Sequence, residues 1–238
     1  MELTYVPYEE LKRVRNLQCS DVKRSQIFAA LARINTLYMI MQAGSGHIGS
    51  SFSAMDIVTW LYLNEMDLAE NPDADGDIYF SSKGHDAPGL YSVLLGLGRL
   101  DFSLIHQLRR LNGLPGHPDV ETPGIHTNTG SLGMGISKAK GMAQAHRLQN
   151  KKARIFVLTG DGELQEGQFW ESLASAVHRK MSEITVIVDH NKIQSDTLVS
   201  LVNDLGDLEV KFAAFGWYVT RCNGHDLSLI HISEPTRL

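Results

Sequence analysis

Two oxygen-bearing side chains follow apolar runs in the second half of the sequence. Asp161 stands in a Gly-Asp-Gly turn after the apolar residues 155–158, and Asn191 follows the apolar residues 184–188. Such oxygen ligands suit Mg²⁺, which takes few protein ligands and completes its octahedron with waters and phosphate oxygens. Gly160 and Gly162 let the backbone approach a phosphate, which the N–H groups at a helix start also attract. These residue types indicate a site for a metal ion and a phosphate.

The elements around these residues predict a βαβ unit. A helical pattern covers residues 168–180 between the two apolar runs, so the runs are expected to be parallel neighbouring strands. Ligands of such folds gather at the carboxyl ends of the strands, where Asp161 and Asn191 would lie side by side. A Gly-Asp-Gly turn alone fits a plain strand-to-helix turn equally well, with Asp as a helix cap. The Asn after the next strand makes the metal site the more specific interpretation.

Three histidines stand in glycine turns rather than in predicted helices. His47 lies in Gly-Ser-Gly-His, His85 in Lys-Gly-His-Asp and His117 in Pro-Gly-His-Pro. Histidine titrates near neutral pH and serves acid–base chemistry, and loops at a sheet edge are where such folds carry function. Four other histidines are interpreted as ordinary surface or core residues: His106, His146, His178 and His190.

Composition excludes several classes of protein. The 238 residues are 43% hydrophobic and 21% charged, with a net charge of −5 and a pI near 6.0. This balance is typical of a globular protein and argues against nucleic acid or an anionic membrane as the main partner. Cys19 and Cys222 cannot build a disulfide framework, which fits a reducing compartment. We find no apolar run of membrane-spanning length and no signal-peptide pattern, and expect a cytoplasmic protein.

The rest of the chain predicts an α/β, doubly wound, mostly parallel sheet of at least five strands with helices on both faces. One amphipathic helix is expected to bury Ile27, Leu31, Ile34, Tyr38 and Met41, with Ser20 or Asp21 as its cap and Gly44 at its end. Further helices are expected over residues 53–63, 89–97, 102–111, 136–147 and 208–215, and further strands over 77–81 and 216–220.

The two ends of the chain are treated separately from the single domain expected over residues 20–226. Residues 1–19 are polar and weakly patterned, and we expect an arm or a short helix. Residues 227–238 resemble the translation of a transposon-type sequencing adapter, with Pro235 in the place where another helix would be expected. We therefore expect the natural sequence to end near Asp226, and His231 is given no role.

Several motifs together resemble the transketolase family. They are GSGHIG, SSKGHDAPGLYSVL, LPGHPDVETPGIHTNTGSLGMGISKAKGMA and GDGELQEG followed by DHNKI, in transketolase order and spacing across almost the whole chain. Other families that bind thiamine diphosphate, such as deoxyxylulose-phosphate synthase, share the Gly-Asp-Gly and Asn element but fit the remaining motifs less well. The resemblance implies the thiamine-diphosphate-binding fold and the transfer of a two-carbon ketol unit between sugar phosphates, as in the pentose phosphate pathway.

The resemblance also implies residue roles. Mg²⁺ would be bound by Asp161, Asn191 and the backbone carbonyl of Ile193. His47, His85 and His117 would be the catalytic histidines, with His85 near the cofactor as well. The remaining contacts to thiamine diphosphate would come from Gly130, Ser131, Leu132, Gly160, Gly162 and Glu163. Ile48 stands where the family usually has proline, so the His47 loop is expected to be less rigid.

The resemblance covers only the part of the family that binds the diphosphate. The glutamate and the aromatic surface that engage the aminopyrimidine ring belong to a second domain of the family. The chain is therefore expected to work with a C-terminal pyrimidine-binding subunit or a downstream domain, as a dimer of such pairs, and to be inactive alone. A non-catalytic or regulatory relative that keeps the fold remains the alternative.

Overall fold

The computed structural model describes residues 3–68 and 76–230. Its elements in chain order are α1 (Tyr8–Arg15), α2 (Asp21–Ala43), α3 (Ile48–Trp60), the π-helical turn η1 (Leu61–Glu65), β1 (Ile78–Ser81), α4 (Ala87–Leu97), the 3₁₀ turn η2 (Phe102–His106), α5 (Gly135–Leu148), β2 (Ile155–Gly160), the 3₁₀ turn η3 (Gly162–Gln165), α6 (Gly167–His178), β3 (Ile184–Asp189), β4 (Ile193–Gln194), β5 (Thr197–Leu198), α7 (Val199–Val202), α8 (Leu208–Ala214) and α9 (Leu227–Ile230).

The central sheet has the order β1-β2-β3, and both strand pairs are parallel. Ile155 of β2 pairs with Ile78 on one side and with Ile184 on the other. The predicted βαβ unit is therefore confirmed as β2-α6-β3. Because the three strands run the same way, their carboxyl ends meet at one edge of the sheet.

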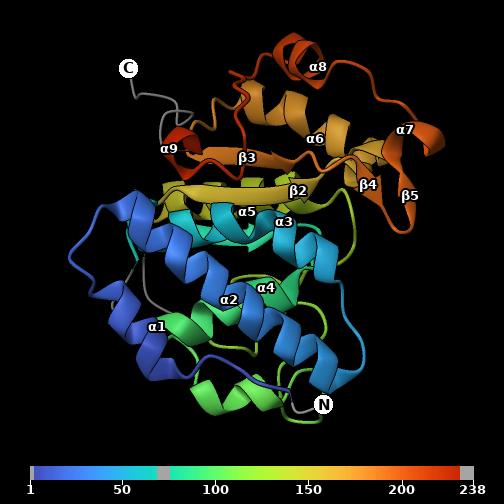
Figure 1. Ribbon diagram of the computed structural model, residues 1–238. Helices are drawn as coiled ribbons and strands as arrows, with labels where there is room; N and C mark the ends of the chain where they lie inside the picture. Colours follow the sequence, from blue (N-terminus) through green and yellow to red (C-terminus); the bar gives the residue numbers. More distant parts are fainter. Residues whose placement is uncertain (1–2, 69–75, 231–238) are drawn as a thin grey trace.

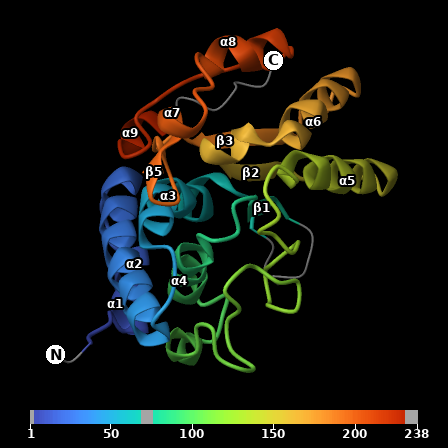
Figure 2. The same ribbon diagram turned by 90° about the vertical axis from the view of Figure 1, so that its right-hand side faces the viewer.

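Helices cover both faces of this sheet, as Figures 1 and 2 show. Phe156 and Leu158 of β2 point into a core shared with α2, α3 and α4, whereas Ile155 and Val157 point into a second core against α5. The alternation follows from the two-residue period of a strand. A third cluster packs α6 against α8 through Phe169 and Phe212. The α/β class with helices on both faces is thus confirmed.

Helix α2 begins and ends where the sequence predicted, and it buries only part of the predicted face. Ser20 accepts a hydrogen bond from the Lys23 N–H, and Gly44 closes the helix in a left-handed conformation. The predicted apolar face was partly wrong, since Ile34 and Met41 are 47% and 52% exposed. Tyr38 is buried as predicted, but because the helix packs against α1, α3 and α4 together, its buried face is wider and also contains Phe28, Ala29, Ala32, Asn35 and Met39.

Two other expectations were wrong. The helix expected over residues 102–111 is only the 3₁₀ turn η2, and Arg109 takes a positive φ angle that a right-handed helix excludes. The strand expected over residues 216–220 does not form, because this segment pairs with no strand among the described residues. The described residues therefore contain a three-stranded parallel sheet and the separate β4–β5 hairpin, rather than one sheet of at least five strands. Trp217 packs there against the α6 and α8 cluster instead.

The ends of the described chain join the main core. Leu11 and Val14 of α1 are fully buried, and Arg15 donates hydrogen bonds to the carbonyls of Gly96 and Leu97. Leu227 of α9 is fully buried near α2 and α3, whereas residues 231–238, including His231 and Pro235, lie outside the described residues. None of the helices in the described ranges is long and apolar enough to span a membrane.

Candidate functional site

The carboxyl ends of β2 and β3 bring the predicted metal ligands to one turn. Asp161 follows β2, and its carboxylate is nearly buried. One carboxylate oxygen accepts from the Gly162 N–H at 2.9 Å, and the other accepts from the Lys192 N–H at 2.6 Å. The Asn191 side-chain oxygen accepts from the next amide, that of Ile193, at 2.9 Å. Asp161 and Asn191 therefore face successive amides of one turn, as the βαβ prediction required.

The donor set of this turn fits a hard cation. Carboxylate and amide oxygens keep a lone pair after accepting one hydrogen bond each, and Mg²⁺ needs only one or two such side chains when it also binds a phosphate. Within residues 3–68 and 76–230, no group of three or more His, Cys, Asp or Glu side chains is arranged to hold a metal ion. A cation at the turn would thus rest on the Asp161 carboxylate, the Asn191 amide and water or phosphate oxygens. Burial raises the pKa of Asp161, against two backbone hydrogen bonds and His190 that lower it.

Two glycine loops touch next to this turn. Gly84, at φ +70°, lies so close to Gly130 that a Cβ at position 84 would be 2.5 Å from the Gly130 nitrogen. Gly130, at φ +115°, lies against the imidazole of His117, and a Cβ there would be 2.7 Å from the ring. A side chain at either position would push the two loops apart. Residues other than glycine also avoid these positive φ angles, so both positions favour glycine. Ser131 and Leu132, which follow Gly130, are exposed, so this loop offers backbone and a hydroxyl to a ligand.

The three predicted histidines converge from three different segments. His47 begins α3, and its ring centroid lies 4.8 Å from that of His85. Burial, Lys83, His47 and His117 lower the pKa of His85, while Asp86 opposes this. Burial, Arg109 and His47 likewise lower the pKa of His117. The His85 and His117 imidazoles are therefore biased toward the neutral form, in which one ring nitrogen accepts and the other donates.

Glu163 holds the loops of the site together. Its buried carboxylate accepts hydrogen bonds from the Ser82 and Thr159 hydroxyls and from the Gly133 and Gly160 N–H groups. These donors come from the ends of β1 and β2 and from the loop after Gly130. The side chain is saturated by protein donors, so a direct cofactor contact of Glu163, which the resemblance implies, is not supported by this carboxylate.

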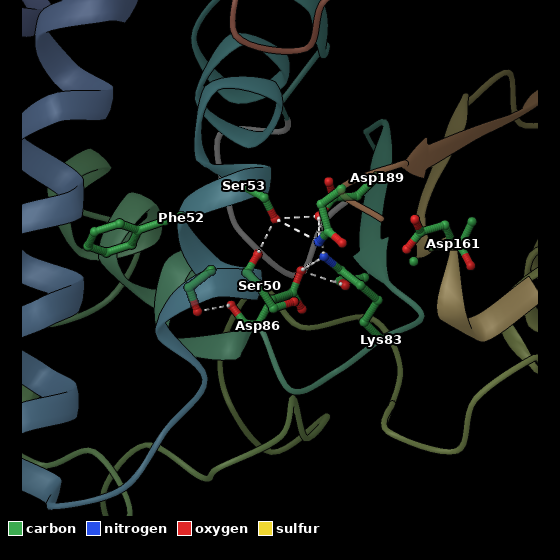
Figure 3. Close-up of polar contacts among 12 residues, drawn as sticks. Ser50, Phe52, Ser53, Lys83, Asp86, Asp161 and Asp189 are labelled. Carbon is green, nitrogen blue, oxygen red and sulfur yellow. Dashed lines mark hydrogen bonds and ion pairs between the residues drawn. The ribbon is translucent and has the colours of Figure 1, made fainter. Parts of the chain in front are cut away.

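A buried ion cluster lies at the ends of β1 and β3, as Figure 3 shows. The Lys83 ammonium is 2.8 Å from Asp189 and 3.5 Å from Asp86, and all three side chains are less than 10% exposed. Ser53 of α3 donates to Asp189 at 2.5 Å, and Ser81 donates to Asp86 at 2.9 Å. Burial alone would lower the pKa of Lys83, but the two carboxylates outweigh it and raise that pKa.

Sequence reasoning missed this cluster and the role of Glu163. Lys83 and Asp86 flank His85 in one turn, which was interpreted only as the setting of a histidine. A lysine and an aspartate three positions apart after a buried strand could have indicated a buried ion pair. Their partner Asp189, however, is more than a hundred positions away in the sequence. Pairs of that kind are found only when the strand order is known.

Comparison with known proteins agrees with this geometry. Residues 24–234 match the family described as transketolase, thiamine diphosphate binding domain. A 6-deoxy-6-sulfo-D-fructose transketolase subunit from Clostridium sp. (strain MSTE9) is 38% identical over 83% of this chain and 74% of its own length. An apulose-4-phosphate transketolase subunit from Actinobacillus succinogenes is 37% identical over 76% of this chain and 67% of its own length.

One protein of known structure shares this fold but has a much longer chain. Transketolase from Campylobacter jejuni superposes with a TM-score of 0.82 at 30% identity, over 91% of this chain and 36% of that chain. Human transketolase, at 34% identity, is covered over 32% of its length. The chain thus spans about a third of these longer relatives and most of the subunit-type relatives. With the family match extending over nearly all of its residues, the chain belongs to the transketolase thiamine-diphosphate-binding-domain family.

Proposed function

We propose that this chain is the diphosphate-binding half of an enzyme that uses thiamine diphosphate and Mg²⁺ to move a two-carbon ketol unit from a ketose to an aldose. The observation that carries the proposal is the convergence of the Asp161–Glu163 turn after β2, the loop after Gly130 and the three histidines, next to the carboxyl ends of β1 and β2. When bound, the thiazolium ring would supply the carbon nucleophile and the electron sink that ketol transfer needs.

The residues of this chain would orient the reactants and move protons. Asp161, Asn191 and the Ile193 carbonyl would hold Mg²⁺ on the diphosphate, and Gly130, Ser131, Leu132, Gly160 and Gly162 would line it. His47 and His117 would hydrogen-bond the sugar hydroxyls, and His85 would lie nearest the reacting ring. The lowered pKa values of His85 and His117 support such a role, because neutral imidazoles can take up a proton from a hydroxyl.

The substrate is proposed to be a ketose with an anionic end, and the partner a pyrimidine-binding subunit. The named substrates of the two subunit-type relatives carry a sulfonate and a phosphate, respectively. Both relatives are called transketolase subunits, which supports a second polypeptide for this chain too. The pairs would associate further as a dimer, and the assembly would act in the cytoplasm.

The metal and cofactor are tested first by Asp161→Asn in the complete enzyme. The change keeps the shape of the side chain but removes a charged ligand from a hard cation, so Mg²⁺-dependent affinity for thiamine diphosphate should fall about tenfold or more. Calorimetry gives the affinity. Asp196→Asn, in the exposed turn between β4 and β5, is the matched control and should leave it unchanged. Equal affinities for wild type and Asp161→Asn would show that the turn is only structural.

The histidines are tested by alanine at His47 and at His117. Either change should lower kcat/KM by about 10²–10⁴, the range for general acid–base groups, while cofactor affinity stays nearly constant. His106→Ala is the control, since this exposed histidine at the end of η2 forms a 2.7 Å hydrogen bond with Tyr38 of α2 and is not one of the three converging histidines. Equal losses of kcat/KM at all three positions would mean that folding, rather than catalysis, is being measured.

A further inference from the structure

Asp189, the last residue of β3, lies between the two candidate metal ligands. Its backbone carbonyl accepts a 3.3 Å hydrogen bond from the Asp161 N–H. Its carboxylate lies 3.4 Å from the side-chain nitrogen of Asn191. The residue is only 7% exposed, so it makes these contacts inside the protein. Asp189 therefore contacts both candidate ligands, each through a different group.

Ser53 of α3 approaches the same asparagine from a distant segment of the chain. Its hydroxyl donates to the Asp189 carboxylate at 2.5 Å and lies 3.4 Å from the Asn191 side-chain nitrogen. The Ser50 carbonyl, at 3.1 Å, is the weaker acceptor for this hydroxyl because it carries no charge. Figure 3 shows Ser53 and Asp189 facing each other, with Lys83 on the same carboxylate at 2.8 Å. The acceptor of the Ser53 hydrogen bond is thus held in place by a buried cation.

These contacts determine which end of the Asn191 amide faces the candidate metal turn. An asparagine amide has one accepting oxygen and one donating NH₂ group, which a flip exchanges. Here the NH₂ group faces the oxygens of Ser53 and Asp189, while the amide oxygen accepts from the Ile193 N–H at 2.9 Å. A flipped amide would place its oxygen against a carboxylate and its NH₂ group against another donor. The Asn191 oxygen is therefore directed into the turn, with a lone pair left for a cation.

We propose that Ser53 and Asp189 are positioning residues that hold the Asn191 oxygen in the direction that a Mg²⁺ ligand needs. The inference rests on the proposed function, because it assumes that Asn191 binds Mg²⁺. Mg²⁺ demands near-ideal octahedral geometry, so a ligand that is free to turn away weakens its binding. Hydrogen-bond partners that orient metal ligands typically contribute about 10- to 100-fold to metal affinity. Because α3 begins directly after His47, Ser53 also connects the metal turn to the helix that carries this histidine.

Calorimetry on the complete enzyme with its partner subunit tests the Ser53→Ala variant. The probe is Mg²⁺ with inorganic pyrophosphate, which offers phosphate oxygens to the metal without the rings of the cofactor. Ser53→Ala should lower the affinity for Mg²⁺ by about tenfold or more. The affinity for Ca²⁺, measured in the same way, should fall by no more than about threefold, because Ca²⁺ accepts flexible coordination. Loss of a merely structural contact would weaken the binding of both cations alike.

Two further variants serve as controls. Ser53→Thr keeps the hydroxyl and should restore most of the Mg²⁺ affinity. Ser182→Ala changes an exposed serine just before β3 and should behave as wild type. Retained Ca²⁺ binding shows that Ser53→Ala has folded. The inference would be overturned by wild-type enzyme that binds no Mg²⁺, by equal Mg²⁺ affinities in wild type and Ser53→Ala, or by equal losses for the two cations.

A ketol-transfer assay on the same proteins separates this inference from the proposed function. Wild-type enzyme that transfers no ketol unit would contradict the proposed function, yet a Mg²⁺-selective loss in Ser53→Ala would still support the positioning of Asn191. Active wild-type enzyme without such a loss in Ser53→Ala would support the proposed function and overturn the inference.

Discussion

Replacing Lys83 by methionine should lower the free energy of unfolding by about 3–5 kcal/mol, the usual cost of breaking a buried ion pair on one side. Methionine fills similar space but leaves the carboxylates of Asp86 and Asp189 buried without their cation. Urea unfolding of the complete enzyme, followed by circular dichroism, measures the change. The loss should be large because the hydroxyls of Ser53 and Ser81 and a 3.4 Å contact from the Asn191 amide cannot compensate two buried negative charges.

The control for Lys83 is an ion pair at the surface. Arg13 and Glu10 of α1 have side chains that are 61% and 48% exposed, so Arg13→Met should change the free energy of unfolding by about 0.5 kcal/mol at most. Adding Asp189→Asn to Lys83→Met should recover part of the lost stability, because it removes one of the unpaired charges. A Lys83→Met protein within about 1 kcal/mol of wild type would contradict the buried cluster.

Glu163→Ala is expected to have the largest effect on cofactor binding among residues that do not themselves touch the cofactor. The change leaves the Ser82 and Thr159 hydroxyls and the Gly133 and Gly160 N–H groups without their acceptor. Residues that hydrogen-bond to and orient the ligand-binding groups typically contribute about 10- to 100-fold to affinity. Glu163→Ala should therefore lower the affinity for thiamine diphosphate with Mg²⁺ by about that factor.

Two further variants separate the hydrogen-bonding role of Glu163 from the general effect of removing a glutamate. Glu163→Gln keeps one acceptor oxygen and should lose less affinity than alanine does. Glu171→Ala changes an exposed glutamate of α6 and should leave calorimetric affinity unchanged. Cofactor affinity that is the same in Glu163→Ala and wild type would show that the three loops hold their places without this carboxylate.

The sequence predicted what local patterns determine. The apolar runs at residues 155–158 and 184–188 led to the βαβ unit, and the glycines around the three histidines led to the turns of the candidate site. The end of α2 at Gly44 followed from the same kind of local rule. Such features depend on backbone preferences of a few neighbouring residues, which a single sequence displays.

What the sequence did not predict depends on contacts between distant segments. Ile34 and Met41 continue an apolar period, yet α2 turns another face to α3 and α4 because it packs against both. Residues 216–220 contain strand-forming side chains but have no strand beside them within the described part of the chain. Glu163 follows a turn typical of an exposed helix start, and only the meeting of the three loops buries it.

The central proposal is that this chain supplies the diphosphate half of a two-part ketol-transfer site. The direct measurement is release of aldose phosphate from a ketose phosphate, followed by a coupled assay with thiamine diphosphate and Mg²⁺. We predict no turnover by the 238-residue chain alone. Turnover should appear when a pyrimidine-binding subunit is added, and Asp161→Asn should reduce it strongly. Robust turnover by the lone chain, or none with the complete pair, would contradict the two-part site.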